Sequence, residues 1–158
     1  MRRTDREVTD RREILAMLAR CDTVRVAMRG GEYPYVVPVS FGVEETADGA
    51  AILYFHCAKQ GEKLARLQQD ARVCIEADRF LGVQRTAHGI TARYESVIAR
   101  GVCSVVTDET EIRRGLRCIL AHYGEESFSL DTCGSLTHTC VCSVVLTSLT
   151  GKRNLPEG

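Results

Sequence analysis

The sequence predicts a mainly β fold with short helices, built as an antiparallel barrel and not as a doubly wound sheet. About six β-branched or alternating segments follow one another along the 158 residues, most of them separated by hairpin-like turns. Only three short segments have the spacing of amphipathic helices. No glycine-rich motif of the G-x-G-x-x-G or G-x-x-x-x-G-K-[ST] type occurs, so Rossmann and P-loop folds lose their main support.

The first elements are a helix and a strand. Asp10 and Glu13 form a capping-box-like start for a helix over residues 10–20. The apolar residues that follow at helical spacing are Ile14, Leu15 and Leu18. The alternating run 23–28 predicts a strand, which the glycine pair 30–31 ends in a turn.

Residues 33–43 (YPYVVPVSFGV) are rich in β-branched and aromatic side chains but include Pro34 and Pro38. Because proline lacks the N–H that a strand ladder needs, we expect an edge strand, a bulge or a ligand-facing stretch here. The Asp-Gly pair 48–49 then predicts a hairpin turn into a strand over residues 51–57.

The second half of the chain predicts two more helices and three more strands. One short helix opens after residues 58–63, and Asp108 with Glu111 caps the other. The predicted strands cover residues 72–78, 92–106 and 139–149. The stretches with little pattern, predicted as loops, are 79–91 and 125–137, and the tail contains Gly151, Lys152 and Arg153.

Charge and hydropathy are those of an ordinary globular protein. Lys plus Arg and Asp plus Glu both total 21, so no global positive field exists to hold nucleic acid or an anionic membrane. Residues 1–12 are charged and lack an apolar signal-peptide core, and the apolar runs are too short to span a bilayer. We therefore expect one cytoplasmic domain over residues 1–158.

The chain has eight cysteines, which we expect to be reduced because no export signal indicates an oxidising compartment. Five lie in strand-like runs, where a free cysteine behaves as a small hydrophobe: Cys57, Cys74, Cys103, Cys140 and Cys142. The tightest cluster is His138-x-Cys140-x-Cys142, whose period-2 spacing predicts one strand face. No second cluster supplies a fourth ligand, so we predict no metal site.

The most informative segment is residues 54–64 (YFHCAKQGEKL), in which a strand ends and a helix begins. The unpaired N–H groups of a helix start favour an anion. Lys59 and Lys63 lie four residues apart beside Gly61, and both could face a bound phosphate. The alternative is a solvated helix start with two surface lysines.

Together with residues 34–41, residues 93–98 and the tail 150–153, this segment resembles the pyridoxamine-5′-phosphate-oxidase-like flavoproteins, especially the branch of nitroimidazole-resistance proteins. In the oxidases, a serine, an arginine and a lysine precede the loop glycine and hold the phosphate of flavin mononucleotide (FMN). This chain has AKQ at residues 58–60, so the resemblance implies a rearranged phosphate site. It does not imply pyridoxamine phosphate oxidation, because the chain has no Trp and matches the substrate-binding ending only loosely.

The resemblance implies a six-stranded Greek-key split β-barrel that forms a homodimer with two FMN sites at the interface. The proline-containing stretch over residues 36–40 would meet the edge of the isoalloxazine ring, and the strand over residues 93–98 would line the flavin from the partner subunit. The implied cofactor-binding residues are Val37, Pro38, Val39, Ser40, Phe55, His56, Ala58, Lys59, Gly61, Lys63, Glu95, Ser96, Lys152 and Arg153.

His56 is the candidate catalytic residue, because the resemblance places a histidine near the flavin or the substrate. The alternatives are a hydrogen-bonded structural histidine and an axial haem ligand. Tyr94 and Glu95 are either a dimer-contact pair or exposed strand residues. The histidines predicted to lie on the solvated surface are His88, His122 and His138.

These observations predict an FMN-dependent oxidoreductase that reduces small acceptors such as nitro compounds. The flavin would do the redox chemistry, and electrons would come from a reduced nicotinamide or a protein donor. The alternative is a haem- or flavin-binding protein without redox turnover of a small substrate.

Overall fold

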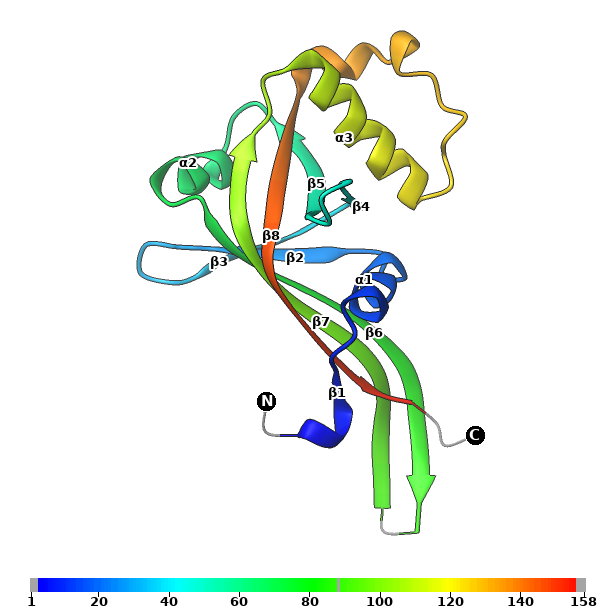
Figure 1. The fold of residues 1–158 in the computed structure, drawn as a ribbon. Helices are drawn as coiled ribbons and strands as arrows, with labels where there is room; N and C mark the ends of the chain where they lie inside the picture. Colours follow the sequence, from blue (N-terminus) through cyan, green and yellow to red (C-terminus); the bar gives the residue numbers. More distant parts are fainter. Residues whose placement is uncertain (1–2, 88, 156–158) are drawn as a thin grey trace.

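The computed structural model, which describes residues 3–87 and 89–155, has a twisted antiparallel sheet with three α-helices around it (Figure 1). The strands are β1 (Glu7–Val8), β2 (Val24–Met28), β3 (Tyr35–Val39), β4 (Phe41–Glu45), β5 (Ala51–Ala58), β6 (Arg72–Thr86), β7 (Gly89–Val105) and β8 (Thr139–Asn154). The helices are α1 (Arg11–Ala19), α2 (Glu62–Gln69) and α3 (Glu109–His122), with short 3₁₀ turns η1 (Thr4–Arg6), η2 (Leu130–Thr132) and η3 (Gly134–His138). None of the described helices is long and apolar enough to cross a membrane.

The strands follow the order β3-β2-β6-β7-β8-β5-β4, and β1 pairs with β8 beside this path. The two edge strands, β3 and β4, are consecutive in the sequence and joined at Ser40. The sheet therefore curls back on itself, although no ladder between the described strands joins β3 to β4. The predicted mainly β antiparallel class is confirmed, but the sheet has eight strands, two more than the sequence predicts.

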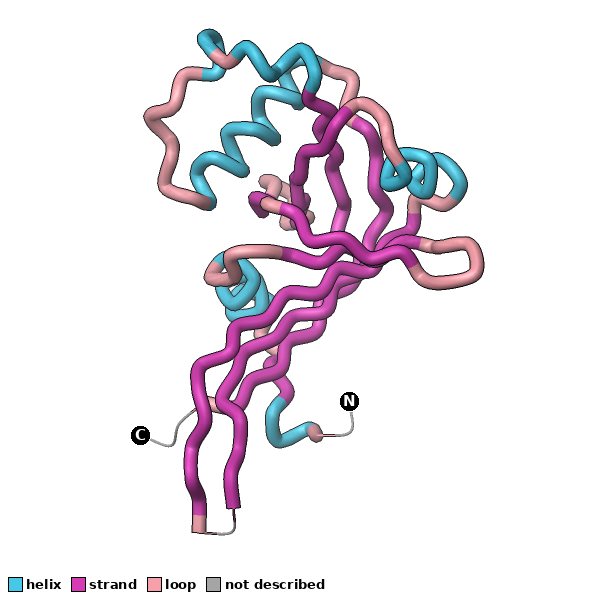
Figure 2. The backbone as a smooth tube through the Cα atoms, turned by 180° about the vertical axis from the view of Figure 1, so that it is seen from behind, coloured by secondary structure: helices cyan, strands magenta, loops and turns pink. Residues whose placement is uncertain are grey.

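The hairpin β6–β7 is the largest correction to the sequence prediction. Residues 79–91 are predicted as a loop, whereas the described part of this segment is almost entirely paired, from Phe80 opposite Tyr94 to Thr86 opposite Gly89. The strand pattern is hidden because the usual pattern is reversed: large apolar side chains are exposed along the arm, whereas the polar Gln84 and Arg93 are the more buried residues. Figure 2 shows the arm extending away from the helices. His88 lies outside the described residues.

β8 also runs farther than predicted, through Asn154, so that the tail residues Lys152 and Arg153 are strand residues. Lys152 lies opposite Glu7 of β1 and opposite Ser96 of β7. The predicted loop 125–137 contains η2 and part of η3.

The prediction of an edge position for the proline-containing segment is confirmed. Pro34 precedes β3, and Pro38 lies within it opposite Arg25 of β2. Since proline donates no hydrogen bond, its nitrogen is tolerated where it faces the free side of an edge strand. Val36 and Ser40, two positions away on either side, then direct their backbone groups to the same free side.

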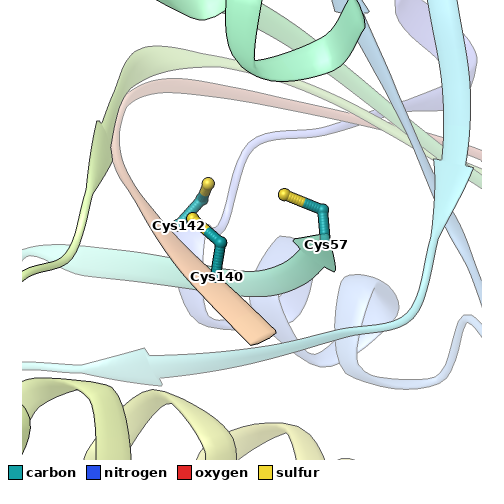
Figure 3. A group of neighbouring side chains, drawn as sticks. All are labelled: Cys57, Cys140 and Cys142. Atoms are coloured by element: carbon teal, nitrogen blue, oxygen red, sulfur yellow. The ribbon is translucent and has the colours of Figure 1, made fainter. Parts of the chain in front are cut away.

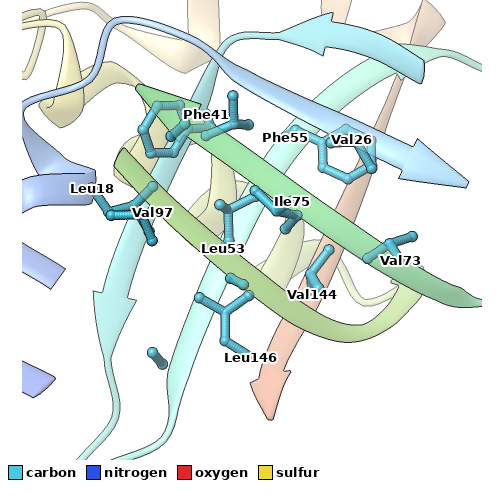
Figure 4. Close-up of a cluster of buried hydrophobic side chains, with 14 of the residues drawn as sticks. Leu18, Val26, Phe41, Leu53, Phe55, Val73, Ile75, Val97, Val144 and Leu146 are labelled. Atoms are coloured by element: carbon cyan, nitrogen blue, oxygen red, sulfur yellow. The ribbon is translucent and has the colours of Figure 1, made fainter. Parts of the chain in front are cut away.

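The main core fills the space inside the curled sheet, as Figure 4 shows. Phe41, Leu53 and Phe55 are fully buried there, and α1 covers one end with Leu18. A second cluster packs α3 on the other face of β5, around Tyr54. Because both faces of β5 are covered, its sequence is a nearly continuous apolar run.

The caps of two helices agree with the sequence prediction. The Asp10 side chain accepts a hydrogen bond from the N–H of Arg12 at the start of α1, and Asp108 accepts one from the N–H of Glu111 at the start of α3. Helix α3 lies against β4 at Gly42, where a Cβ atom would come within 2.4 Å of the Cys118 carbonyl oxygen.

Candidate functional site

The loop between β5 and α2 has the geometry of an anion-binding helix start. Gly61 is the N-cap of α2 and has φ of 132°, a conformation that residues with a Cβ rarely adopt. No side chain caps this helix, and its first backbone bond runs from the Ala65 N–H to the Gly61 carbonyl. The N–H groups of residues 62–64 therefore remain available, at the positive end of the helix dipole, for an anion.

Two lysines lie at this helix start. Lys63 is half-buried, and its Nζ atom lies 5.5 Å from the ring centroid of the buried Phe55. Lys59 is exposed in the loop. Within residues 3–87 and 89–155 neither lysine forms an ion pair, so both charges are available to a ligand. The observed arrangement fits a phosphate group.

The edge strand β3 lies on the same side of the molecule as α2 (Figure 1). A Cβ atom at Gly31, in the β2–β3 turn, would lie 3.6 Å from the Arg66 guanidinium of α2. Val37 is half-buried and Val39 is buried, whereas Pro38 and Ser40 are exposed along the free edge. The unpaired backbone groups of this edge fit a planar ring that carries both hydrogen-bond donors and acceptors.

His56 points to the opposite face of β5 from Phe55, toward α3. It lines a cavity of about 150 Å³ whose other walls are mostly apolar: Leu116, Ile119, Leu120, Phe128, Leu130, Cys133, Leu136 and Thr139. His56 is exposed, but partial desolvation beside the cavity, and then the positive charge of Lys63, lower its pKa. The imidazole is therefore neutral at neutral pH, and no hydrogen bond links it to another described residue.

Glu95 is buried in ion pairs within its own chain. Its side chain is 7% exposed, and its carboxylate accepts a hydrogen bond of 2.7 Å from Arg20 and lies 3.6 Å from Arg79. The alternative of an exposed strand residue is therefore wrong for Glu95. Tyr94 is half-buried, and the Lys152 Nζ atom lies 5.8 Å from its ring centroid.

The remaining tail residues are also engaged. The Arg153 guanidinium pairs with Glu13 of α1. Ser96 is half-buried on β7, with its Oγ atom 3.5 Å from the Lys152 carbonyl oxygen, to which it donates. These contacts tie β7, β8 and α1 together.

The predicted flavin residues form two groups that one chain does not bring together. Ala58 pairs with Thr139 of β8, whereas Ser96 pairs with Lys152 of the same strand. Positions 139 and 152 are 13 residues apart, which is about 40 Å along a strand at roughly 3.3 Å per residue. Figure 1 shows α2 near one end of the molecule and this part of β7 nearer the other. A flavin could touch both groups only if a second chain supplied one of them.

His122 is not the solvated surface residue that the sequence predicts. Its Nε2 atom lies 2.9 Å from the Cys21 carbonyl oxygen, and its ring centroid lies 4.2 Å from that of Phe41. His122 therefore fixes the end of α3 against β4 and the segment that enters β2. His138, at the end of η3, is exposed as predicted.

The structure also adds a third thiol to the two that the sequence places on one strand face. The eight cysteines lie outside disulfides, and the Sγ atoms of Cys57, Cys140 and Cys142 lie within 4.8 Å of one another. His138, predicted to share a strand face with two of them, lies instead in η3 and outside this group. Cys57 was missed because only the pairing of β5 with β8 brings it to the others.

Comparison with known proteins gives both a family and a fold. The family model described as pyridoxamine 5′-phosphate oxidase matches residues 10–153. No curated protein sequence matches the chain.

Among solved structures, a protein of Bacteroides thetaiotaomicron described as a candidate 5-nitroimidazole antibiotic resistance protein is 28% identical, with a TM-score of 0.81 over 92% of this chain and 85% of that one. A flavocytochrome of Azotobacter vinelandii is 20% identical, with a TM-score of 0.79 over 99% of this chain and 72% of that one. The FAD- and haem-binding protein of Mycobacterium smegmatis is 18% identical, with a TM-score of 0.77 over 97% and 76%. At 20% and 18% identity, the similarities to the latter two structures show the fold alone.

Proposed function

Because the chain belongs to the pyridoxamine 5′-phosphate oxidase family, we propose that it binds FMN as a homodimer and reduces small acceptors such as nitro compounds. The observation that carries this proposal is the start of α2, where backbone N–H groups without a helix partner follow Gly61, beside Lys59 and Lys63, which form no ion pair within the described residues. This is the donor set that a phosphate dianion needs. The bound flavin would supply the electron transfer, and the chain would supply position and proton contacts.

Different parts of the chain would hold different parts of the cofactor. The N–H groups of residues 62–64, with Lys59 and Lys63, would hold the phosphate. The free edge of β3, from Val37 to Ser40, would hydrogen-bond the polar edge of the ring. The segment around Ser96 and Lys152 of the partner subunit would close the site from the other side.

The choice of nitro compounds is supported by the relative with 28% identity, which is described as a candidate 5-nitroimidazole resistance protein. The cavity beside His56 is small, apolar and without a cationic clamp, so it favours an uncharged acceptor over a phosphorylated one. We propose a reduced nicotinamide or a protein as the electron donor and the cytoplasm as the compartment.

The absorption spectrum of the freshly purified protein tests the cofactor. We expect the two-band spectrum of oxidised flavin, and mass spectrometry of the released cofactor should give FMN. Anaerobic reduction, followed by addition of a 5-nitroimidazole, should reoxidise the flavin with loss of the nitro absorbance. A single intense haem band, or a reduced flavin that no nitro compound reoxidises, would contradict the proposal.

An apolar stripe on the outer face of the sheet supports the homodimer. Val102 of β7 pairs with Val145 of β8, and each is 47% exposed. Ile98 lies on the same face of β7 and is 40% exposed. Exposed apolar residues grouped on one sheet face are typical of an interface, although the exposed Arg100 lies between Ile98 and Val102 here.

The double substitution Val102→Glu/Val145→Glu is expected to raise the dimer dissociation constant at least about tenfold, because it buries like charges opposite each other. Sedimentation equilibrium should then show the 17.5 kDa monomer at concentrations where the unaltered protein has twice that mass. Tyr33→Glu, at an apolar residue that is 74% exposed in the β2–β3 turn, is the control. A monomeric unaltered protein at micromolar concentration would refute the dimer.

His56→Ala is expected to lower acceptor turnover about tenfold or more, because a neutral imidazole in the cavity can orient the acceptor or pass it a proton. FMN content and melting temperature should change little, since no described residue depends on His56 for a hydrogen bond. His138→Ala, at an exposed histidine, is the matched control. Loss of activity only in parallel with unfolding would mean that His56 is structural.

A further inference from the structure

The three clustered thiols come from two paired strands. Cys57 of β5 lies directly opposite Cys140 of β8, and Cys142 lies two residues farther along β8, on the same strand face. Figure 3 shows their three sulfur atoms on the same side of the two paired strands. Their Sγ atoms all lie within 4.8 Å of one another. This grouping follows from the strand register and does not depend on the flavin proposal.

The spacing of the sulfurs is close to that of a metal-thiolate site. With metal–sulfur bonds of about 2.3 Å, three sulfurs around one ion lie about 3.8–4.0 Å apart. Small rotations about the Cα–Cβ bonds would close the remaining difference. Cys57 and Cys140 lie near strand ends and are only partly buried, so an ion has a path from solvent.

The charges around the thiols also fit a metal. A metal ion would displace the thiol protons to solvent as each metal–sulfur bond forms, with no change of oxidation state. The positive charges of Lys59 and Lys63 act on Cys140 and Cys57 respectively and would offset the negative charge of a trithiolate.

The ligand set is entirely soft. No histidine or carboxylate of the described chain belongs to the group, whereas a fourth thiol, Cys103, is close enough to hydrogen-bond with Cys142. Thiolates of this kind select Cu(I) and Zn(II) over hard ions such as Mg²⁺. We propose that Cys57, Cys140 and Cys142 bind one soft metal ion, Cu(I) or Zn(II), with Cys103 as the available fourth sulfur. Three-coordinate binding favours Cu(I), and recruitment of Cys103 favours Zn(II).

Competition with a chelator of known affinity tests the site. The reduced full chain, prepared without oxygen, is titrated separately with Cu(I) and with Zn(II). We expect one ion per chain, and we expect Cys57→Ser and Cys140→Ser each to weaken binding of the preferred ion at least a hundredfold. Cys74→Ser is the matched control, because Cys74 is also a partly buried strand cysteine but lies outside the group. It should leave the affinity unchanged.

Alkylation of the unaltered protein gives a readout that needs no variant. The bound ion should slow the alkylation of Cys57 and Cys140 at least tenfold, measured peptide by peptide, while Cys74 reacts at its usual rate. Melting curves of both serine variants identify any loss of binding that follows from unfolding. The proposal is overturned if the reduced protein binds neither ion, if Cys74→Ser weakens binding as much as the other two, or if binding protects none of the three clustered thiols.

Discussion

Replacing Lys59 and Lys63 together with alanine is expected to weaken FMN binding at least a hundredfold and to leave riboflavin binding nearly unchanged. Only FMN carries a phosphate, and each charge-assisted contact contributes about 1.5–3 kcal/mol when it is partly desolvated. Two such contacts correspond to about two to four orders of magnitude in affinity, since about 1.4 kcal/mol is a factor of ten. Lys63 should contribute more than Lys59, because its side chain is half-buried and less screened by water.

Titration of the flavin-free protein with FMN and with riboflavin, followed by flavin fluorescence, measures this difference. Arg12→Ala is the control for net charge, because Arg12 is an exposed cation on α1. The single variants Lys59→Ala and Lys63→Ala separate the two contributions. An equal loss for both flavins would show that the lysines act on the fold or on the ring, and an unchanged FMN affinity would remove the phosphate site from the start of α2.

Elements that depend on residues close to one another in the sequence could be predicted from it. The caps Asp10 and Asp108 and the turn at Gly49 depend on residues within one helical turn or one hairpin. The edge position of the segment with Pro38 follows from the missing N–H of proline. The arm of β6 and β7 could not be predicted, because its large apolar side chains lie on the exposed face and polar side chains such as Gln84 and Arg93 lie on the more buried face.

The features of the candidate site also separate into local motifs, which the sequence predicts, and long-range contacts, which it does not. The helix start at Gly61 is a local motif, and α2 begins there as expected, whereas the binding of a phosphate by its two lysines stays a prediction. The Cys57–Cys140 pairing is not visible in the sequence, because it depends on the register between strands more than 80 residues apart. The packing of His122 against Phe41 is likewise a long-range contact.

The segment around Ser96 is a different case, because the structure of one chain places it far along β8 from the start of α2. Its role in a flavin site depends on a second chain. Glu95, its neighbour, offers a way to separate that role from a structural one, since its contacts within the chain are known.

Glu95→Gln is expected to lower the free energy of unfolding by about 2–3 kcal/mol. The substitution keeps the shape of the side chain but removes the charge that pairs with Arg20 and Arg79. Breaking a buried ion pair costs about 3–5 kcal/mol, and the cost should be smaller here because both arginines are more than a third exposed and can regain water. Glu76→Gln is the matched control, since Glu76 pairs with the exposed Arg25 on β2 and should contribute about 1 kcal/mol or less.

Urea denaturation of both variants measures the difference as a shift of the midpoint at constant slope. The affinity for FMN, measured without urea on the folded variants, then separates the two roles of Glu95. If the side chain only holds α1 to β7, Glu95→Gln should bind FMN as tightly as Glu76→Gln does. If it also lines the flavin site of the partner subunit, its FMN affinity should fall while that of the control does not. Equal midpoints for the two variants would contradict the structural role, because a carboxylate that is 7% exposed would then contribute no more than one at the surface.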